Sequence, residues 1–147
     1  MKSLSRLISN DRIVSLSASD KEGALKEMVG VIAKSAELSD SDKIHEAILE
    51  REGLLSTGFG LGLAIPHAKL DGVKDFVVGL GLHVEGLEYE SLDDKPVHIL
   101  TMIIGPNSRQ EEYLRVLARV TAFLKENREK LLECETPDEI YELTLEY

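Results

Sequence analysis

The sequence predicts one α/β (α+β) domain over residues 1–147, with a single mixed β-sheet flanked by helices on its faces. Strand-like and helix-like segments interleave irregularly along the chain. Residues 76–84 alternate between large apolar and mostly small residues, and residues 97–104 are apolar on both faces. No linker, repeat or low-complexity segment interrupts this pattern, so we expect one compact core.

The N-terminal part carries a strand signal followed by a helix signal. Residues 13–17 form a short strand-like run. Ser19 with Glu22 three positions later makes a capping box, which marks a helix start. The apolar residues that follow share one helix face, namely Leu25, Met28, Val29, Ile32, Ala33 and Ala36. We therefore expect an amphipathic helix here.

A second helix is predicted to begin at Ser39, with Asp42 in its first turn, and to end at a glycine cap, Gly53. Arg51 lies seven positions after Ile44 and so falls on the buried stripe of this helix. Its stem could lie along the core with its head in water, or its guanidinium could pair with a carboxylate. The third interpretation is a guanidinium aimed at a phosphate, which suits its fork of donors.

Two strands are predicted in the middle of the chain. The run over 76–84 gives one filled face and one nearly bare face, because Gly79 and Gly81 lie on the second. We expect a helix backbone to pack closely on these glycines, and we interpret His83 as a structural histidine at the rim. Residues 97–104 predict a central strand, since both of its faces are apolar.

Two more helices are predicted in the C-terminal part. Ser108 with Glu111 makes a capping box ahead of a long apolar stripe whose first member is Tyr113. Thr136 is the expected cap of the last helix, because Pro137 then occupies the first helical position, which proline favours.

Composition limits the partners and the compartment. The formal net charge of −10 argues against nucleic acid and anionic membrane as partners. Cys134 is the only cysteine and the four histidines lack metal-ligand spacing, so we expect no disulfide, no metal and no other cofactor. No signal-peptide pattern and no run of ~20 apolar residues occurs, which predicts a cytoplasmic protein without direct membrane insertion.

The chemistry of the sequence is concentrated in residues 56–70. Glycine occupies every second position over 58–62, which leaves open backbone N–H donors. Pro66 then presents His67 from constrained backbone. An imidazole with an ordinary pKa near ~6.5 keeps a neutral fraction at neutral pH, so one ring nitrogen can act as a nucleophile. The alternative is a surface or structural histidine.

Other catalytic motifs are missing. Residues 58–62 lack the Gly-Lys-Ser/Thr of a P-loop and the G-x-G-x-x-G spacing, and no G-x-S-x-G nucleophile elbow is present. A fixed histidine beside glycine-rich main chain and an inward arginine suits a histidine that is itself phosphorylated. The phosphoryl group carries about two negative charges, which N–H groups and a guanidinium would stabilise.

Five motifs follow one another along the chain: Arg51-Glu52, the Ser-Thr-Gly-x-Gly-x-Gly loop at 56–62, the Ala-Ile-Pro-His segment at 64–67, the strand at 95–99, and Gly105-Pro106. In this order they resemble the enzyme IIA domain (EIIA type 2) of the fructose and mannitol class of the bacterial phosphotransferase system (PTS), which includes the nitrogen-regulatory proteins. The resemblance covers essentially the whole chain.

The resemblance implies that His67 is the catalytic residue, which accepts a phosphoryl group on Nε2 from an HPr-like phosphocarrier protein. It implies that Arg51 lies beside this histidine, and we expect the amides of Gly58 and Gly60 to help hold the phosphoryl group. Tyr113 stands where the family has a second, assisting histidine. We expect it to stabilise the phosphoryl group less well, because a phenol donates one hydrogen bond but supplies no positive charge.

Three functional hypotheses result. The first is a phosphotransferase component with a covalent phosphohistidine, which passes its phosphoryl group to an EIIB component or permease. The second is a nitrogen-regulatory type of protein-binding module with weak or lost transfer because of Tyr113, and the stand-alone length favours this branch. The third is a structural relative that has lost transfer. His98 is a candidate to compensate for Tyr113, although its strand favours a structural role.

Overall fold

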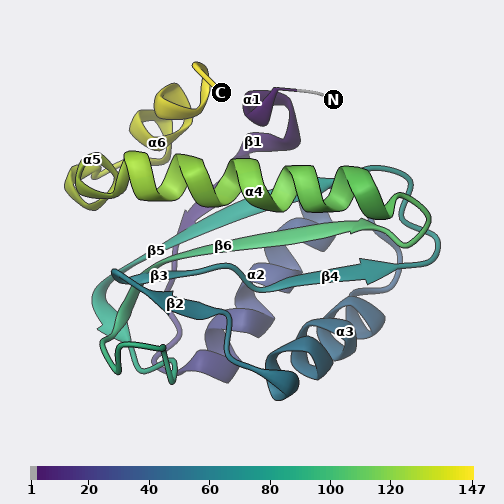
Figure 1. The fold of residues 1–147 in the computed structure, drawn as a ribbon, viewed down its shortest axis with the longest axis horizontal. Helices are drawn as coiled ribbons and strands as arrows, with labels where there is room; N and C mark the ends of the chain where they lie inside the picture. Colours follow the sequence, from purple (N-terminus) through teal and green to yellow (C-terminus); the bar gives the residue numbers. More distant parts are fainter. Residues whose placement is uncertain (1–2) are drawn as a thin grey trace.

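The computed structural model describes residues 3–147 and places a mixed sheet between two groups of helices (Figure 1). In chain order the elements are α1 Leu4–Leu7, β1 Ile8–Ser15, α2 Lys21–Ser35, α3 Ser41–Leu54, β2 Gly58–Gly60, β3 Leu63–Ala64, β4 His67–Leu70, β5 Val77–Leu87, β6 Val97–Pro106, α4 Gln110–Glu126, α5 Arg128–Glu133 and α6 Pro137–Thr144. The predicted fold class is confirmed.

Strand β6 is the centre of the sheet, as its two apolar faces predict. The strand order within the described residues is β1-β5-β6-β3-β2, and β4 also pairs with β6. Strands β5 and β6 are antiparallel, whereas β3 and β4 run parallel to β6 one after the other along the same edge. His67, the first residue of β4, is thereby paired with Ile103.

Two apolar cores lie on opposite faces of the sheet. Helices α1, α4, α5 and α6 cover one face, where Val116, Val120 and Leu124 of α4 are buried. Helices α2 and α3 cover the other face, where Met28 and Ile32 of α2 are buried (Figure 1). The sequence stripes of both helices therefore face the sheet as predicted.

The bare face of β5 is a packing surface, as predicted, but its occupants are side chains and not a helix backbone. A Cβ at Gly79 would lie 3.0 Å from carbons of Met28 and Ile32, and one at Gly81 would lie 2.7 Å from Leu16. The filled face was expected to extend to Val84, yet Val84 is 89% exposed. This end of β5 extends past its regular pairing with β6, whose register shifts after Leu82.

Two predicted helix starts are displaced by one residue. Asp20, not Ser19, caps α2 by accepting a hydrogen bond from the amide of Gly23 at 2.8 Å. Asp40, not Ser39, caps α3 by accepting from Lys43 at 3.1 Å. Aspartate and serine are both good caps, so adjacent candidates cannot be separated by residue type alone.

At the remaining helix ends, one predicted cap is confirmed and two are wrong. Thr136 caps α6, and its side chain accepts from the amide of Glu139. The predicted capping box at Ser108 does not form, because α4 begins after Arg109 without a side-chain cap. Gly53 is not a C-terminal cap, since α3 continues to Leu54.

Candidate active site

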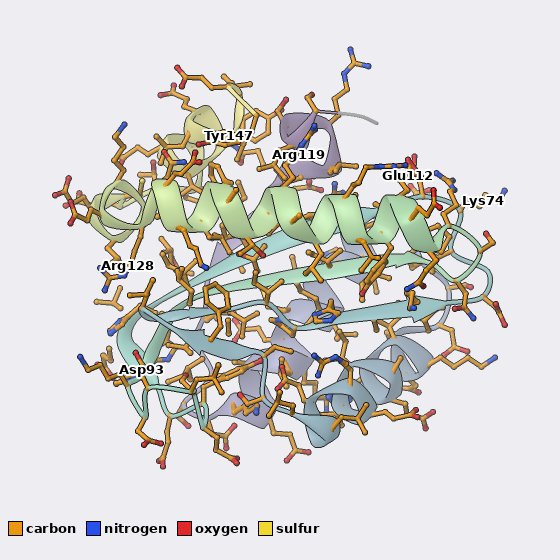
Figure 2. All side chains as sticks on the ribbon, in the orientation of Figure 1. Lys74, Asp93, Glu112, Arg119, Arg128 and Tyr147 are labelled. Atoms are coloured by element: carbon orange, nitrogen blue, oxygen red, sulfur yellow. The ribbon has the colours of Figure 1, made fainter. Side chains whose placement is uncertain are left out.

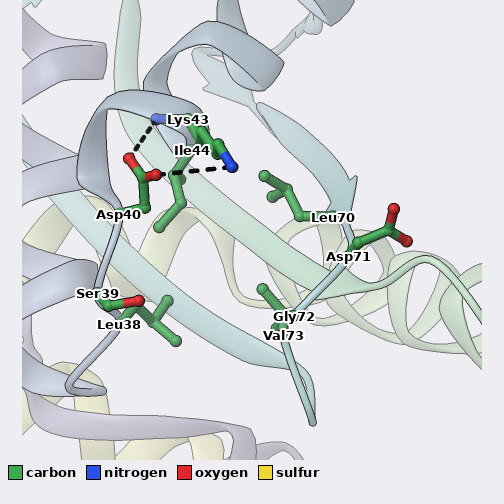
Figure 3. Close-up of a pocket in the computed structure, with 9 residues that line it drawn as sticks. All are labelled: Leu38, Ser39, Asp40, Lys43, Ile44, Leu70, Asp71, Gly72 and Val73. Atoms are coloured by element: carbon green, nitrogen blue, oxygen red, sulfur yellow. Dashed lines mark hydrogen bonds and ion pairs between the residues drawn. The ribbon is translucent and has the colours of Figure 1, made fainter.

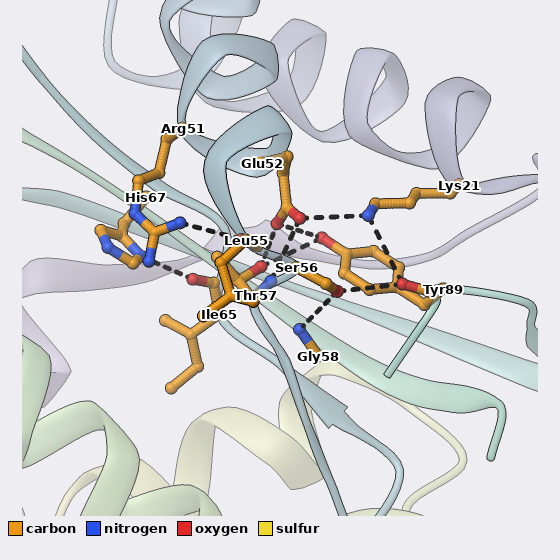
Figure 4. A network of polar contacts seen from close by, with 10 residues as sticks. All are labelled: Lys21, Arg51, Glu52, Leu55, Ser56, Thr57, Gly58, Ile65, His67 and Tyr89. Atoms are coloured by element: carbon orange, nitrogen blue, oxygen red, sulfur yellow. Dashed lines mark hydrogen bonds and ion pairs between the residues drawn. The ribbon is translucent and has the colours of Figure 1, made fainter. Parts of the chain in front are cut away.

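A single hydrogen bond fixes the orientation and tautomer of His67. Its Nδ1 lies 2.7 Å from the carbonyl oxygen of Ile65 (Figure 4). A carbonyl can only accept, so Nδ1 carries the proton and Nε2 keeps its lone pair. Pro66 has no N–H and interrupts the strand pairing at this point, which leaves the Ile65 carbonyl available. The imidazole is partly exposed, so a partner can reach it.

The environment of His67 favours the neutral ring. Burial lowers the pKa of His67 below its ordinary value of 6.5, and the positive charges of Arg51 and Lys69 lower it further. The hydrogen bond to Ile65 and the charge of Glu52 raise the pKa, but burial has the larger effect. The imidazole is therefore a neutral nucleophile at neutral pH.

Arg51 lies close enough to His67 for its charge to lower the pKa of the histidine. Its Nη1 donates to the carbonyl oxygen of Leu55 at 2.9 Å, which holds the guanidinium just past the end of α3. Figure 4 shows the guanidinium next to the imidazole of His67. The arginine therefore makes one structural hydrogen bond and keeps further N–H donors on its guanidinium.

Tyr113 reaches the same site from α4. Its ring centroid is 6.1 Å from that of His67, and the residue is only 3% exposed. Its hydroxyl is buried without a hydrogen-bond partner among residues 3–147. Burial raises the pKa of Tyr113, so the phenol stays neutral and can donate one hydrogen bond. A Cβ at Gly105 would lie 3.0 Å from this ring, so the glycine makes room for it.

A buried polar network around Glu52, which sequence reasoning did not find, supports the segment that leads to the site (Figure 4). One carboxylate oxygen accepts from the hydroxyl of Tyr89 at 2.8 Å and from the hydroxyl of Thr57. The other accepts from the amide of Thr57 and from Lys21, both at 3.1 Å. The sequence signal for this network was the Arg51-Glu52 pair. Neighbouring residues of a helix point in different directions, so the two side chains contact different parts of the fold.

The glycine loop forms the β2–β3 hairpin that precedes His67 in the chain. The amide of Gly58 donates to Ser56 Oγ at 3.1 Å, and Figure 4 shows Gly58 apart from the imidazole. Gly60 takes a φ of +101° at the tip of the β2–β3 hairpin, a conformation that favours glycine. The expectation that Gly58 offers an open amide is therefore wrong, because the hydroxyl of Ser56 accepts from it.

Two charged side chains hold the tip of this hairpin. Leu61 donates its amide to Asp93 at 3.1 Å, and its carbonyl accepts from Arg128 Nε. Figure 2 shows Asp93 and Arg128 at the edge of the molecule where β2 and β3 turn. The tip is thus tied to the β5–β6 connection on one side and to α5 on the other.

The other histidines on the sheet have structural contacts. His98 Nδ1 bonds to the carbonyl oxygen of His83 at 3.0 Å, and His83 Nε2 bonds to that of Ala18 at 2.8 Å. The predicted structural role of His83 is supported by this contact. Within the described residues no group of three or more His, Cys, Asp or Glu side chains is placed to bind a metal ion.

Five hollows of the surface are lined by residues other than His67. One of about 250 Å³ lies between the α2–α3 turn and the β4–β5 turn (Figure 3). It is lined by Leu38, Ser39, Asp40, Lys43, Ile44, Leu70, Asp71, Gly72 and Val73. In the part of the chain that the structure describes, no helix has the length and apolarity that crossing a bilayer requires.

This architecture matches solved proteins. The nitrogen regulatory protein IIA-Ntr from Neisseria meningitidis superposes with a TM-score of 0.88, which covers 96% of this chain and 98% of that chain at 26% identity. The arrangement of sheet and helices is thus that of an α+β protein of the EIIA class.

The sequence comparisons identify the family. Residues 6–147 match the family model described as phosphoenolpyruvate-dependent sugar phosphotransferase system, EIIA 2, and the chain belongs to this family. It is 36% identical over 128 residues to the fructose-specific EIIA component of Haloferax volcanii, covering 86% of this chain and 83% of that protein. It is 38% identical over 132 residues to the fructose-specific EIIABC component of Bacillus subtilis, covering 88% of this chain but only 21% of that protein.

Proposed function

We propose that this chain is a phosphohistidine carrier of the phosphotransferase system, which accepts a phosphoryl group on Nε2 of His67. The single observation that carries the proposal is the 2.7 Å contact between Nδ1 and the carbonyl of Ile65. This contact favours the tautomer with the proton on Nδ1 and leaves the lone pair of Nε2 as the nucleophile. The lowered pKa of His67 supports the same proposal, since the neutral ring is the reactive form.

The transfer step needs no proton movement. The lone pair of His67 Nε2 attacks the phosphorus of a phosphohistidine on an HPr-like phosphocarrier protein, and a new N–P bond forms. The donor N–P bond breaks, and its electron pair returns to the donor imidazole. The proton on Nδ1 stays on the bond to Ile65, whose carbonyl stabilises the positive charge that develops on the ring.

Arg51 and Tyr113 are proposed to stabilise the transferred group. The guanidinium of Arg51 supplies charge-assisted hydrogen bonds to phosphoryl oxygens, and the buried, unpartnered hydroxyl of Tyr113 donates one more. For Gly58 we revise the expected role, because its amide donates to Ser56 Oγ; for Gly60 we keep the proposal that its amide helps to hold the phosphoryl group.

The surface next to His67 suits a protein partner. Leu55, whose carbonyl holds Arg51, is 62% exposed, and Leu114, which follows Tyr113, is 54% exposed. Exposed apolar side chains beside a reactive group favour docking of another protein. We propose an HPr-like carrier as donor and an EIIB component, permease or regulatory protein as the next partner, all in the cytoplasm. Residues 1–147 are proposed to form one EIIA domain.

A regulatory role is the second candidate. It is favoured by the superposition on the nitrogen regulatory protein IIA-Ntr at a TM-score of 0.88, and by Tyr113, whose neutral phenol stabilises a phosphoryl group less than a cation would. In this role, phosphorylation of His67 switches the binding of a regulatory target. Pull-down with phosphorylated and unphosphorylated protein separates the two candidates: recovery of sugar-permease components alone would argue for transport.

The decisive experiment is labelling with phosphoenolpyruvate and the general phosphotransferase proteins. Wild-type protein should gain one phosphoryl group, which ¹⁵N NMR should locate on Nε2 of His67. The His67→Gln variant should gain none. The matched control is His98→Gln, which removes another partly buried histidine and should still be labelled. A folded wild-type protein that stays unlabelled, or a label on Nδ1, would refute the proposal.

A further inference from the structure

The site built from His67, Arg51 and Tyr113 is short of positive charge. A phosphoryl group on His67 carries about two negative charges, and a phosphate-bearing site needs cations to match them. Arg51 supplies one positive charge. Tyr113 supplies none, because its hydroxyl is buried and the pKa of Tyr113 is raised. The residue that completes the charge balance must therefore come from another position.

Lys69 is placed to supply this charge. It lies two residues after His67 in β4, and alternate residues of a strand share one face of the sheet. Its Nζ lies 5.4 Å from the centroid of the Tyr113 ring, and that ring centroid is 6.1 Å from the centroid of the His67 ring. The ammonium therefore stands over the same aromatic side chain that borders the imidazole.

Two contacts with the start of α4 steer the ammonium of Lys69. Its Nζ donates to Oε1 of Gln110, the first residue of the helix, and it faces the ring of Tyr113. Gln110 and Tyr113 are three residues apart and so lie on one side of the helix. An ammonium over an aromatic face gains a cation–π attraction, which holds the flexible stem near His67.

The charge of Lys69 is available to an anion. Among residues 3–147 the charged side chains of Lys21, Lys43 and Arg109 form ion pairs, whereas Lys69 forms none. The Lys69 side chain is exposed, so it can move from Gln110 towards a new partner. The charged groups that act on His67 are Arg51, Glu52 and Lys69, and both cations lower its pKa. The ammonium is therefore electrostatically coupled to the imidazole before any phosphoryl group arrives.

We infer that Lys69 is a phosphoryl-binding residue of this chain, held over the ring of Tyr113 by Gln110, and that it provides the second positive charge of the site. The inference rests on the proposed phosphorylation of His67. Tyr113 then has two roles: its hydroxyl donates a hydrogen bond to the phosphoryl group, and its ring positions the ammonium of Lys69. The neutral phenol of Tyr113 and the ammonium of Lys69 thus act together on the phosphoryl group.

The test compares Lys69→Met, which keeps the stem without the charge, with Lys69→Arg, which restores a cation. Lys26→Met, which removes an exposed lysine on α2, is the matched control. Isolated phosphorylated protein is followed by ³¹P NMR in the absence of any partner, so docking cannot influence the result. Lys69→Met should raise the pKa of the phosphoryl group and change the rate of dephosphorylation roughly 3- to 10-fold, whereas Lys69→Arg and Lys26→Met should resemble wild type.

A second readout uses the unphosphorylated protein. Lys69→Met should raise the pKa of His67, measured by NMR titration of the ring protons, and Lys26→Met should leave it unchanged. If wild-type protein accepts a phosphoryl group but Lys69→Met matches wild type in both pKa values, the inference about Lys69 is overturned alone. If wild-type protein accepts none, the proposed function of His67 fails and this inference fails with it.

Discussion

Replacing Glu52 by glutamine tests whether the buried network supports the active site. The side chain of Glu52 is almost fully buried and receives hydrogen bonds from Tyr89, Thr57 and Lys21. In the Glu52→Gln variant the amide oxygen can still accept from the Thr57 amide and from Lys21. The amide NH₂ can donate to the two hydroxyls, since hydroxyls also accept. The variant therefore loses the charge but keeps the geometry.

The expected change in the free energy of unfolding follows from this loss of charge. Losing the charge-assisted part of these bonds should cost about 1–2 kcal/mol in the free energy of unfolding. Glu52→Ala should cost more, about 3–5 kcal/mol, because it leaves the Tyr89 hydroxyl and the Thr57 amide buried without partners. Glu50→Gln is the control, since Glu50 lies on the exposed side of the same helix and should change stability by less than about 0.5 kcal/mol.

Urea unfolding at neutral pH measures these free energies, and an NMR titration of His67 in the same samples measures the connection to the site. The negative charge of Glu52 raises the pKa of His67, so Glu52→Gln should lower that pKa. If Glu52→Gln were as stable as Glu50→Gln and left the pKa of His67 unchanged, the network would have no role in either the fold or the site.

Three further outcomes are expected. The rate of His67 labelling should stay constant at neutral pH and fall only below pH 6.5, because the lowered pKa keeps the ring neutral above that value; a fall that begins at higher pH would contradict the assigned environment. Gly105→Ala should cost about 1–3 kcal/mol in urea unfolding and slow labelling, because the new Cβ would lie 2.7 Å from the Phe76 ring and 3.0 Å from the Tyr113 ring. Gly30→Ala, with no atom within 4 Å, should not destabilise the fold. Thr136→Ala should cost about 1 kcal/mol through loss of the α6 cap without changing labelling, and an unchanged unfolding midpoint would argue against the cap.

The fold was predictable where periodicity and burial are strong. The stripe of α4 and the doubly apolar strand β6 both occupy the positions that their patterns indicate. The short strands β2, β3 and β4 were not predicted, because two to four residues hold too little periodicity to be distinguished from a loop. These strands form because β6 offers a long edge with which they can pair. Since β6 lies in a distant part of the chain, the local sequence does not reveal this pairing.

The site was predictable in its residue types but not in its contacts. The spacing from Ile44 indicated an inward Arg51, and Pro66 indicated a fixed His67; the structure brings the two side chains together. The open amide expected at Gly58 is occupied by Ser56, a hydrogen bond that no sequence pattern reveals. Lys69 drew no attention in the sequence because its significance depends on α4, which begins about 40 residues later in the chain.

The pairing of β3 and β4 with β6 fixes how the chain can vary in length. Leu63 pairs with Ile99 and His67 pairs with Ile103, so both sides advance by the same four residues even though Pro66 interrupts the ladder. An insertion or deletion between these points would turn the imidazole to the opposite side of the sheet or move it away from Arg51. The connection after β5 is constrained as well, because Tyr89 donates to Glu52 and Asp93 accepts from the amide of Leu61. Natural variation in length should therefore spare the spacing from 63 to 67.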